Sequence, residues 1–192
     1  AKKKVITNWW QPNLKKIASS KKEFALAVGR LEKVKGFDLL ISSWKNIKSN
    51  LVIIGSGQEK ESLSKLINEY DLNNKIKIVD EIKSDELNNY YSKASVLIIS
   101  SINEGGPRVA LEALFLKIPV LSTNVGHMEQ IFPNEFLAEK NNVASLTKLL
   151  EDYVDDIDLL NQDAIFEYVK DEFSVEEKAR QTLDVYKDIL QS

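Results

Sequence analysis

The 192-residue chain contains no cysteine and a single histidine, His127. The lack of cysteine excludes disulfides, thiolate metal sites and a cysteine nucleophile. A single histidine excludes a multi-histidine metal site and any mechanism that needs two histidines from this chain. Glycine and proline, at 7 and 4 residues, are too scarce for a collagen-like chain or a low-complexity linker. Apolar runs are short, so neither a transmembrane helix nor a signal peptide is expected.

Charge is unevenly distributed along the chain, although the net charge is only −3. Residues 1–50 carry 12 Lys/Arg against 3 Asp/Glu, whereas residues 151–192 carry 4 against 13. The basic part could meet an anion such as a phosphate, a membrane surface or a nucleic acid; the alternative is a face of solvated lysines. The acidic C-terminal part argues against general nucleic-acid binding, and the 43% hydrophobic content suits a soluble globular protein.

Five short apolar segments predict β-strands, at residues 24–28, 51–54, 76–79, 96–99 and 119–121. Several of them are apolar at nearly every position instead of alternating. Both of their faces should therefore be covered, as in a parallel sheet between two layers of helices.

Between and after the strands, apolar residues recur at helical spacing, within residues 37–44, 63–70, 87–94, 146–154 and 179–190, with a further helix around 113–114 ending before Pro119. Ser174 and Glu177 form a capping-box pattern at the start of the last helix. This alternation predicts an α/β fold, a Rossmann-like doubly wound parallel sheet with helices on both faces. We expect one domain over 1–192, with 1–23 as a connecting strand and loop, 24–132 as the core and 143–192 as C-terminal helices.

In such a sheet ligands bind beyond the carboxyl ends of the strands, so the loops that follow the strands are the candidate sites. The loop after 24–28 carries Arg30 and Lys35, two cations suited to a diphosphate. The loop after 51–54 carries Gly55 and Gly57, which permit close approach of a ligand. It lacks the third glycine of the dinucleotide fingerprint, which disfavours a nicotinamide or flavin cofactor.

Two further loops extend this candidate site. After 76–79, the backbone at Ile82 and Lys83 could line a base pocket. After 96–99, a loop with two glycines and a proline opens a helix whose N-terminal N–H groups could bind an anion. Carboxylates next to an anion-binding site are unexpected, because like charges repel. Glu104 and Glu112 are suited instead to accept hydrogen bonds from the hydroxyls of a sugar and a ribose.

Four blocks in this order and spacing, within residues 24–132, resemble the C-terminal nucleotide-sugar-binding domain of retaining glycosyltransferases of family 4, which have the GT-B fold. The blocks are Gly29-Arg30-Leu31-x3-Lys35-Gly36, Ile54-Gly55-x-Gly57, Ser101-x2-Glu104-Gly105-x-Pro107-x-Val109-x2-Glu112-Ala113 and Pro119-Val120-x2-Thr123-x2-Gly126. Lys117 departs from the pattern where a glycine is usual, and His127 stands in place of a second glycine.

The resemblance implies a role for each matching residue. Glu104 would be the catalytic carboxylate that holds the sugar hydroxyls near the reacting carbon, and Glu112 would hold the ribose. The remaining implied contacts are Arg30, Lys35, Gly106 and Val109 on the donor diphosphate, Gly105 and Gly106 on the sugar, Gly55 and Gly57 in the glycine loop, and Ile82 and Lys83 in the base pocket.

The implied reaction moves a hexosyl group from a nucleotide diphosphate sugar, with UDP as the expected nucleotide, to a saccharide or lipid-linked acceptor with retained anomeric configuration. No cofactor and no metal are expected, and no nucleic acid. The resemblance further implies a separate N-terminal acceptor domain, without which this chain should have little activity. It also implies a cytoplasmic enzyme of polysaccharide or surface-glycan synthesis, with peripheral contact to the inner face of the membrane. The alternatives are another GT-B enzyme such as a sugar epimerase, or a noncatalytic nucleotide-binding module.

Overall fold

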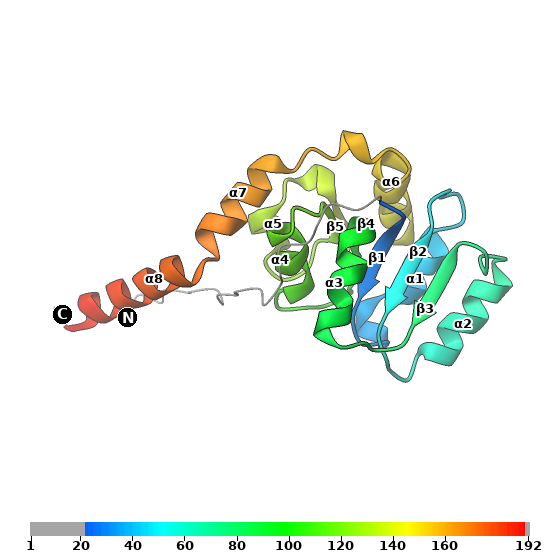
Figure 1. Cartoon of the computed structure of the whole chain (residues 1–192), viewed down its shortest axis with the longest axis horizontal. Helices are drawn as coiled ribbons and strands as arrows, with labels where there is room; N and C mark the ends of the chain where they lie inside the picture. The colour runs from blue at the N-terminus through cyan, green and yellow to red at the C-terminus, as the bar shows by residue number, and fades with distance from the viewer. Residues whose placement is uncertain (1–21, 191–192) are drawn as a thin grey trace.

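The structure, a computed structural model, describes residues 22–190 and contains one six-stranded parallel sheet in that range (Figure 1). The strand order is β3-β2-β1-β4-β5-β6, and every neighbouring pair is parallel. The strands are β1 Phe24–Val28, β2 Leu51–Ile54, β3 Ile76–Val79, β4 Ala94–Ile99, β5 Val120–Thr123 and β6 Leu137–Ala138. The chain runs outward from β1 to β3 and then crosses over to β4. The order therefore reverses between β1 and β4, where a doubly wound sheet binds its ligands.

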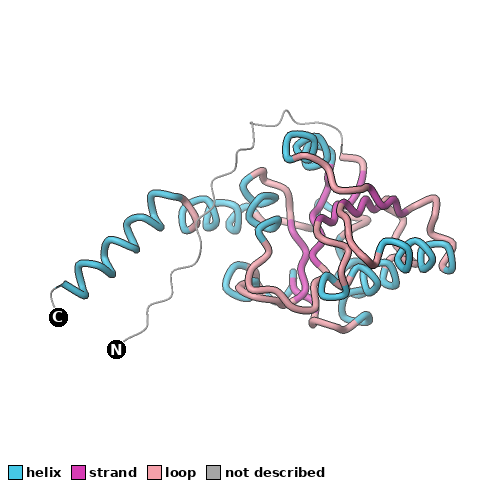
Figure 2. The backbone as a smooth tube through the Cα atoms, turned by 90° about the horizontal axis from the view of Figure 1, so that it is seen from below, coloured by secondary structure: helices cyan, strands magenta, loops and turns pink. Residues whose placement is uncertain are grey.

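Helices lie on both sides of this sheet (Figure 2). One group packs together through α1 with α2 and α6, and the other through α7 with α4 and α5. The helices are α1 Phe37–Ser43, α2 Lys60–Glu69, α3 Ser84–Lys93, α4 Arg108–Phe115, α5 Met128–Ile131, α6 Val143–Tyr153, α7 Asp163–Glu172 and α8 Val175–Leu190. The predicted fold class is confirmed.

The apolar runs mark the strands because the sheet is buried on both faces. All four residues of β2 and of β5 are buried, as are five of the six in β4. The predicted bounds of β1, β2 and β3 agree with the structure. The strand predicted at 96–99 begins earlier in the structure, at Ala94. The helical pattern had included Ala94, but α3 ends at Lys93 and the chain passes directly into β4. The predicted 119–121 strand is shifted to Val120–Thr123, since Thr123 still pairs with Ala138 of β6.

Three of these helices and strands were not predicted, and neither were the short 3-10 helices Lys33–Lys35, Asn134–Phe136 and Ile157–Leu159. The four residues of α5 and the two of β6 are too short to show a period. Helix α7 buries Ile165, Phe166 and Val169. These residues lie at helical spacing among acidic residues, so the sequence contained a signal for this helix that was overlooked. The proposed connecting segment 1–23 lies outside the described residues except for Lys22 and Glu23.

At the junction of α7 and α8, half of the predicted capping box forms. The Glu177 amide donates to Ser174 Oγ at 3.1 Å. The Glu177 carboxylate is instead held by the side chains of Arg180 and Gln181. The far end of α8 exposes Leu183, Tyr186 and Leu190 to solvent, and Figure 1 shows this helix extending away from the sheet. Within residues 22–190, no helix combines the length and the apolar character needed to cross a membrane.

Lys117 ends α4 in a left-handed conformation, with φ 56°. The Ile118 amide donates to Ala113 O at 2.8 Å and the Lys117 amide to Leu114 O at 3.0 Å. These two bonds make a Schellman motif, whose left-handed position glycine occupies at the least cost. The departure from the family pattern at Lys117 therefore carries backbone strain.

We predict that Lys117→Gly raises the free energy of unfolding by about 0.5–1 kcal/mol, because relief of the left-handed strain exceeds the added chain entropy of glycine. Urea denaturation followed by circular dichroism measures this. The matched control is Lys148→Gly, an exposed lysine inside α6, which should lower the free energy of unfolding by about 1 kcal/mol. Equal destabilisation by both substitutions would show that Lys117 is not strained.

Candidate functional site

The loops after β1 and β4 are joined across the point where the strand order reverses. The Ile102 amide donates to Val34 O at 2.8 Å, and the Ser100 hydroxyl donates to Lys35 O at 2.9 Å. Gly36 follows with φ 60°, and a Cβ there would lie 2.2 Å from the carbonyl oxygen of Ser100. Only glycine allows this approach, so the loop that carries Lys35 is held against the end of β4.

The loops after β1, β2 and β3 are also tied to one another through their backbones. The Gly29 amide donates to Ile54 O at 3.0 Å, and the Leu31 amide donates to Ser56 O at 2.8 Å. Next along the sheet, the Gly55 amide donates to Val79 O at 3.0 Å. The carboxyl ends of the three strands therefore form one continuous floor.

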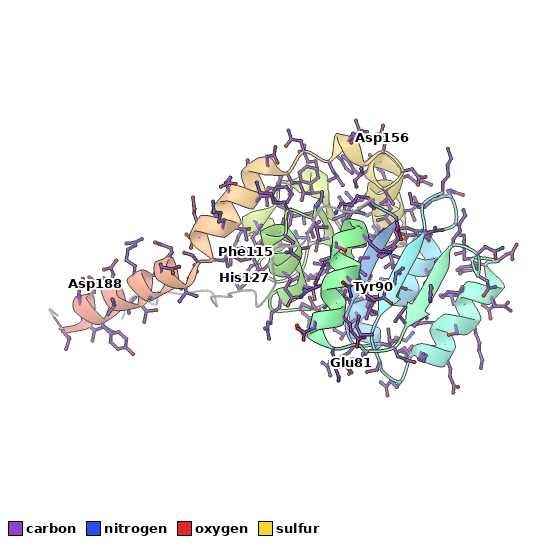
Figure 3. All side chains as sticks on the ribbon, in the orientation of Figure 1. Glu81, Tyr90, Phe115, His127, Asp156 and Asp188 are labelled. Atoms are coloured by element: carbon purple, nitrogen blue, oxygen red, sulfur yellow. The ribbon has the colours of Figure 1, made fainter. Side chains whose placement is uncertain are left out.

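Above this floor lies a cavity of about 770 Å³. Its lining comes from the loops after β1, β2 and β3 and from the facing sides of α3 and α4. The lining residues are Val28, Gly29, Arg30, Lys35, Ile54, Gly55, Ser56, Glu81, Ile82, Ser84, Leu87, Arg108, Val109 and Glu112. Figure 3 shows Glu81 at the end of the sheet where α3 begins. The volume falls in the range of pockets that hold small organic ligands.

The cavity brings together six of the predicted site residues, which are Arg30, Lys35, Gly55, Ile82, Val109 and Glu112. The other five do not line it. Lys83 is the N-cap residue of α3 and is not among the lining residues, and Gly57 lies against the backbone of Leu31. Glu104, Gly105 and Gly106 lie beyond the cavity, toward the loop after β5.

The Gly105–Gly106 segment rests on that loop. A Cβ on Gly126, which has φ 56°, would lie 2.4 Å from Gly105 O. The ring of His127 approaches Gly106, since a Cβ there would lie 3.4 Å from His127 Cδ2. His127 occupies the N-cap position of α5 without a side-chain cap hydrogen bond, and Figure 3 places it apart from Glu81. The two glycines thus form a separate lip next to the cavity.

Lys35 connects this lip to the cavity through an ion pair with Glu104 Oε1. Both side chains are largely buried, with 21% of Lys35 and 12% of Glu104 exposed. Burial lowers the pKa of the Lys35 ammonium, the nearby Arg30 guanidinium lowers it further, and Glu32 opposes the shift. The second oxygen of Glu104, Oε2, is buried and has no hydrogen-bond partner. A buried carboxylate oxygen without a donor is energetically costly, which favours a binding role for Glu104 over a purely structural one.

Arg30 lies at the mouth of the cavity, with 73% of its side chain exposed. Its Nη1 donates to Glu32 Oε1 at 2.7 Å. Exposed ion pairs of this kind contribute little to stability, so the guanidinium can exchange this partner for an anion in the cavity.

Glu112 lies on α4 and faces the cavity from the side opposite the loops. Its Oε2 accepts a hydrogen bond from Tyr91 Oη at 2.8 Å. Arg108 precedes it by one helical turn and lines the same cavity. The first turn of α4 therefore adds a cation to an N-terminal helix end, an arrangement that favours anions.

Sequence reasoning missed Arg108, Tyr91, Ser84 and the pair formed by Ser56 and Glu81, in which Ser56 Oγ donates to Glu81 Oε2 at 2.9 Å. Arg108 could have been found from the sequence, because it directly precedes Val109, a predicted site residue, in the first turn of α4. Ser84 is the first residue of α3, whose N-cap position is taken by Lys83. The contact of Tyr91 depends on the packing of two helices and leaves no local signal.

No group of three or more His, Asp and Glu side chains that could hold a metal ion is found within the part of the chain that the structure describes. Three cations, Arg30, Lys35 and Arg108, line the cavity together with the carboxylates Glu81 and Glu112, and Glu104 pairs with Lys35 beside it. The cations suit a diphosphate and the carboxylates suit hydroxyls.

Residues 11–165 match the sequence model of the family described as Glycosyl transferases group 1. An uncharacterized glycosyltransferase of Haemophilus influenzae is 30% identical over 145 residues, 71% of this chain and 40% of that protein. A Campylobacter jejuni enzyme, named N-acetylgalactosamine-N,N'-diacetylbacillosaminyl-diphospho-undecaprenol 4-alpha-N-acetylgalactosaminyltransferase, is 32% identical over 79% of this chain and 42% of its own length. The chain spans less than half the length of these relatives.

A solved glycosyltransferase structure from Rickettsia africae is similar, with a TM-score of 0.76 and 26% identity. The similarity covers 90% of this chain and 49% of that one. The fold is therefore shared with a glycosyltransferase over nearly the whole of this chain.

We predict that Gly36→Ala lowers the free energy of unfolding by about 2–4 kcal/mol, because the new methyl group collides with the Ser100 carbonyl at a left-handed position. Thermal and urea denaturation measure the loss. Gly105→Ala is the matched control, since a Cβ at Gly105 meets nothing within 4 Å, and it should stay within about 0.5 kcal/mol of the wild type. Similar values for both variants would contradict the role given to Gly36.

Proposed function

The chain belongs to the group 1 glycosyl transferases, and from that membership we propose that it is the nucleotide-sugar-binding half of a retaining enzyme of family 4. The proposed enzyme transfers a hexosyl group from a nucleotide diphosphate sugar, with UDP as the expected nucleotide, to a saccharide or lipid-linked acceptor. The observation that carries the proposal is one cavity beside the reversal point of the sheet, whose lining brings together Arg30, Lys35 and Glu112.

The diphosphate is the leaving group of this reaction, and its negative charge grows as the bond to the sugar breaks. Lys35 would stabilise that charge from the loop after β1, and Arg108 and the first turn of α4 from the opposite side. Arg30 would close the mouth of the cavity over the outer phosphate oxygens. Fixed cations and helix dipoles aimed at developing charge lower the barrier without reorganisation. On this proposal the chemistry needs no metal.

The positions of the other parts of the donor follow from the residues that line the cavity on either side of the proposed diphosphate site. The base would lie toward Ile82 and Leu87, on the side of the cavity formed by β3 and α3, and the ribose would meet Glu112 on α4. The sugar would extend the other way, toward the lip at Gly105 and Gly106. There the free oxygen of Glu104 would accept hydrogen bonds from its hydroxyls.

The acceptor would come from a second domain, because this chain spans less than half of its curated relatives. The exposed apolar side chains of α8 support contact with such a domain, since Leu183 and Tyr186 are 58% and 62% exposed. The name of the Campylobacter relative places its acceptor on a diphospho-undecaprenol carrier, which supports a lipid-linked acceptor here. We accordingly propose a cytoplasmic enzyme of surface-glycan synthesis that works at the inner face of a membrane.

We predict that the 192-residue chain binds UDP in EDTA, measured by calorimetry alongside GDP and ADP. Lys35→Met should weaken nucleotide binding by about tenfold or more, because a buried charge-assisted contact to the diphosphate is lost. Arg30→Ala should weaken it severalfold, since this guanidinium is exposed.

The matched control is Lys33→Met, in the same loop. Lys33 is exposed, pairs with Asp38 at 3.5 Å and is not among the residues that line the cavity. It should leave nucleotide affinity unchanged. An absence of binding of all three nucleotides by the folded wild type, or equal losses in the Lys33 and Lys35 variants, would refute the proposed site.

The ion pair between Lys35 and Glu104 yields a second prediction. In the empty site Glu104 neutralises the lysine that the diphosphate needs, and its carboxylate repels the incoming phosphates. Glu104→Gln should therefore bind UDP about fivefold more tightly than the wild type, although transfer by the complete enzyme should be abolished. Calorimetry and a transfer assay measure the two effects.

Glu59→Gln serves as the control for charge alone. Glu59 faces Lys33 at 3.9 Å and is outside the cavity lining, so its removal should change neither UDP affinity nor transfer. Unchanged or weaker UDP binding in Glu104→Gln would contradict the competition between Glu104 and the diphosphate.

A further inference from the structure

Tyr91 contacts Glu112, the carboxylate proposed to hold the ribose, and is not itself among the residues that line the cavity. It lies on the face of α3 that turns toward the cavity, because Ser84, Leu87 and Tyr91 are spaced by three and four residues. Its side chain is fully buried. Its hydroxyl reaches α4, where it donates to Glu112 Oε2 at 2.8 Å.

The chemistry of this contact makes Tyr91 a fixed donor. Burial raises the pKa of the Tyr91 hydroxyl, and the negative charge of Glu112 raises it further, so the proton stays on the phenol at any physiological pH. A neutral hydroxyl that donates to a carboxylate forms a strong, directional hydrogen bond. The last torsion of a glutamate side chain is otherwise broad, and a single donor on one oxygen is enough to set it.

The carboxylate keeps its capacity for a ligand in this arrangement. Each carboxylate oxygen has about two acceptor positions, so Tyr91 occupies one of the four. Oε1 and the second position on Oε2 remain for donors that come from the cavity. Two neighbouring hydroxyls of one sugar ring supply two such donors side by side.

We propose that Tyr91 is a positioning residue, which donates to Oε2 and thereby orients the carboxylate of Glu112 toward the 2′- and 3′-hydroxyls of the ribose. This inference rests on the proposed function, since it assumes a nucleotide in the cavity. It goes beyond that function because it assigns ribose recognition to a contact between two helices and not to Glu112 alone. The same contact holds the cavity-facing side of α3 against α4.

The test compares UDP with 2′,3′-dideoxyuridine diphosphate, which lacks both ribose hydroxyls, in calorimetric titrations of the 192-residue chain. If GDP or ADP is the nucleotide that the wild type binds, that nucleotide and its dideoxy counterpart are used. The wild type should bind the ribonucleotide about tenfold more tightly. Tyr91→Phe should lose most of this preference while binding the dideoxy nucleotide as the wild type does. A purely structural loss would weaken both nucleotides equally.

Glu112→Gln should lose the same preference, and the double variant Tyr91→Phe, Glu112→Gln should lose no more than Glu112→Gln alone. The matched control is Tyr90→Phe, the same change one residue away, where the ring packs against Phe24 with centroids 6.1 Å apart. It should keep the preference.

The outcomes separate the two claims. A wild type that binds none of the three nucleotides overturns the proposed donor site and this inference with it. A wild type that binds the ribo and dideoxy forms equally keeps nucleotide binding but overturns ribose recognition by Glu112, and with it the role of Tyr91. A wild type that discriminates, with Glu112→Gln losing the preference and Tyr91→Phe retaining it, overturns the role of Tyr91 alone.

Discussion

The contact between the loops after β1 and β4 is the constraint on which the site depends. Two hydrogen bonds join these loops at the reversal point of the strand order, where parallel strands run apart and leave a crevice. The contact requires the backbone at Gly36 to approach the Ser100 carbonyl within a distance that no side chain permits. Because the contact is made by backbone and one serine, it leaves the Lys35 side chain directed at the crevice. The cation is thereby placed by the sheet itself, and not by a flexible loop.

A buried ion pair is a poor way to stabilise a fold, because the desolvation of two charges offsets most of their attraction. The pair formed by Lys35 and Glu104 makes physical sense as a pair of binding groups that neutralise each other when the site is empty. The unpartnered oxygen of Glu104 points the same way, since a structural carboxylate would have its hydrogen bonds satisfied. The proposed donor would satisfy both groups at once, with phosphate on the lysine and hydroxyls on the glutamate.

Much of the fold was predictable because strands that are buried on both faces of a sheet appear in the sequence as unbroken apolar runs. The bounds of β1, β2 and β3 and the class of the sheet followed from those runs. The short elements α5 and β6 carry too few residues to show a period, and the early start of β4 reflects a helix that enters a strand without a loop. For the site, the loops that line the cavity were predictable from their position after the strands, and Arg30, Lys35 and Glu112 in its lining were among the residues singled out. Tyr91 was not, because a hydroxyl that crosses from α3 to α4 depends on how two helices pack.

The placement of the site residues divides the proposed reaction between two parts of the molecule. Arg30, Lys35 and Glu112 line one cavity whose walls are tied to the sheet by backbone hydrogen bonds, so a nucleotide would meet a largely preformed surface. Glu104, Gly105 and Gly106 lie at its lip, next to the loop after β5, where a sugar would face outward. A preformed nucleotide site with the reacting carbon at its edge suits an enzyme in which another domain supplies the acceptor and excludes water by closing. On the proposed function, this half of the enzyme would hold the nucleotide of the donor, and the transfer step would also need the acceptor domain.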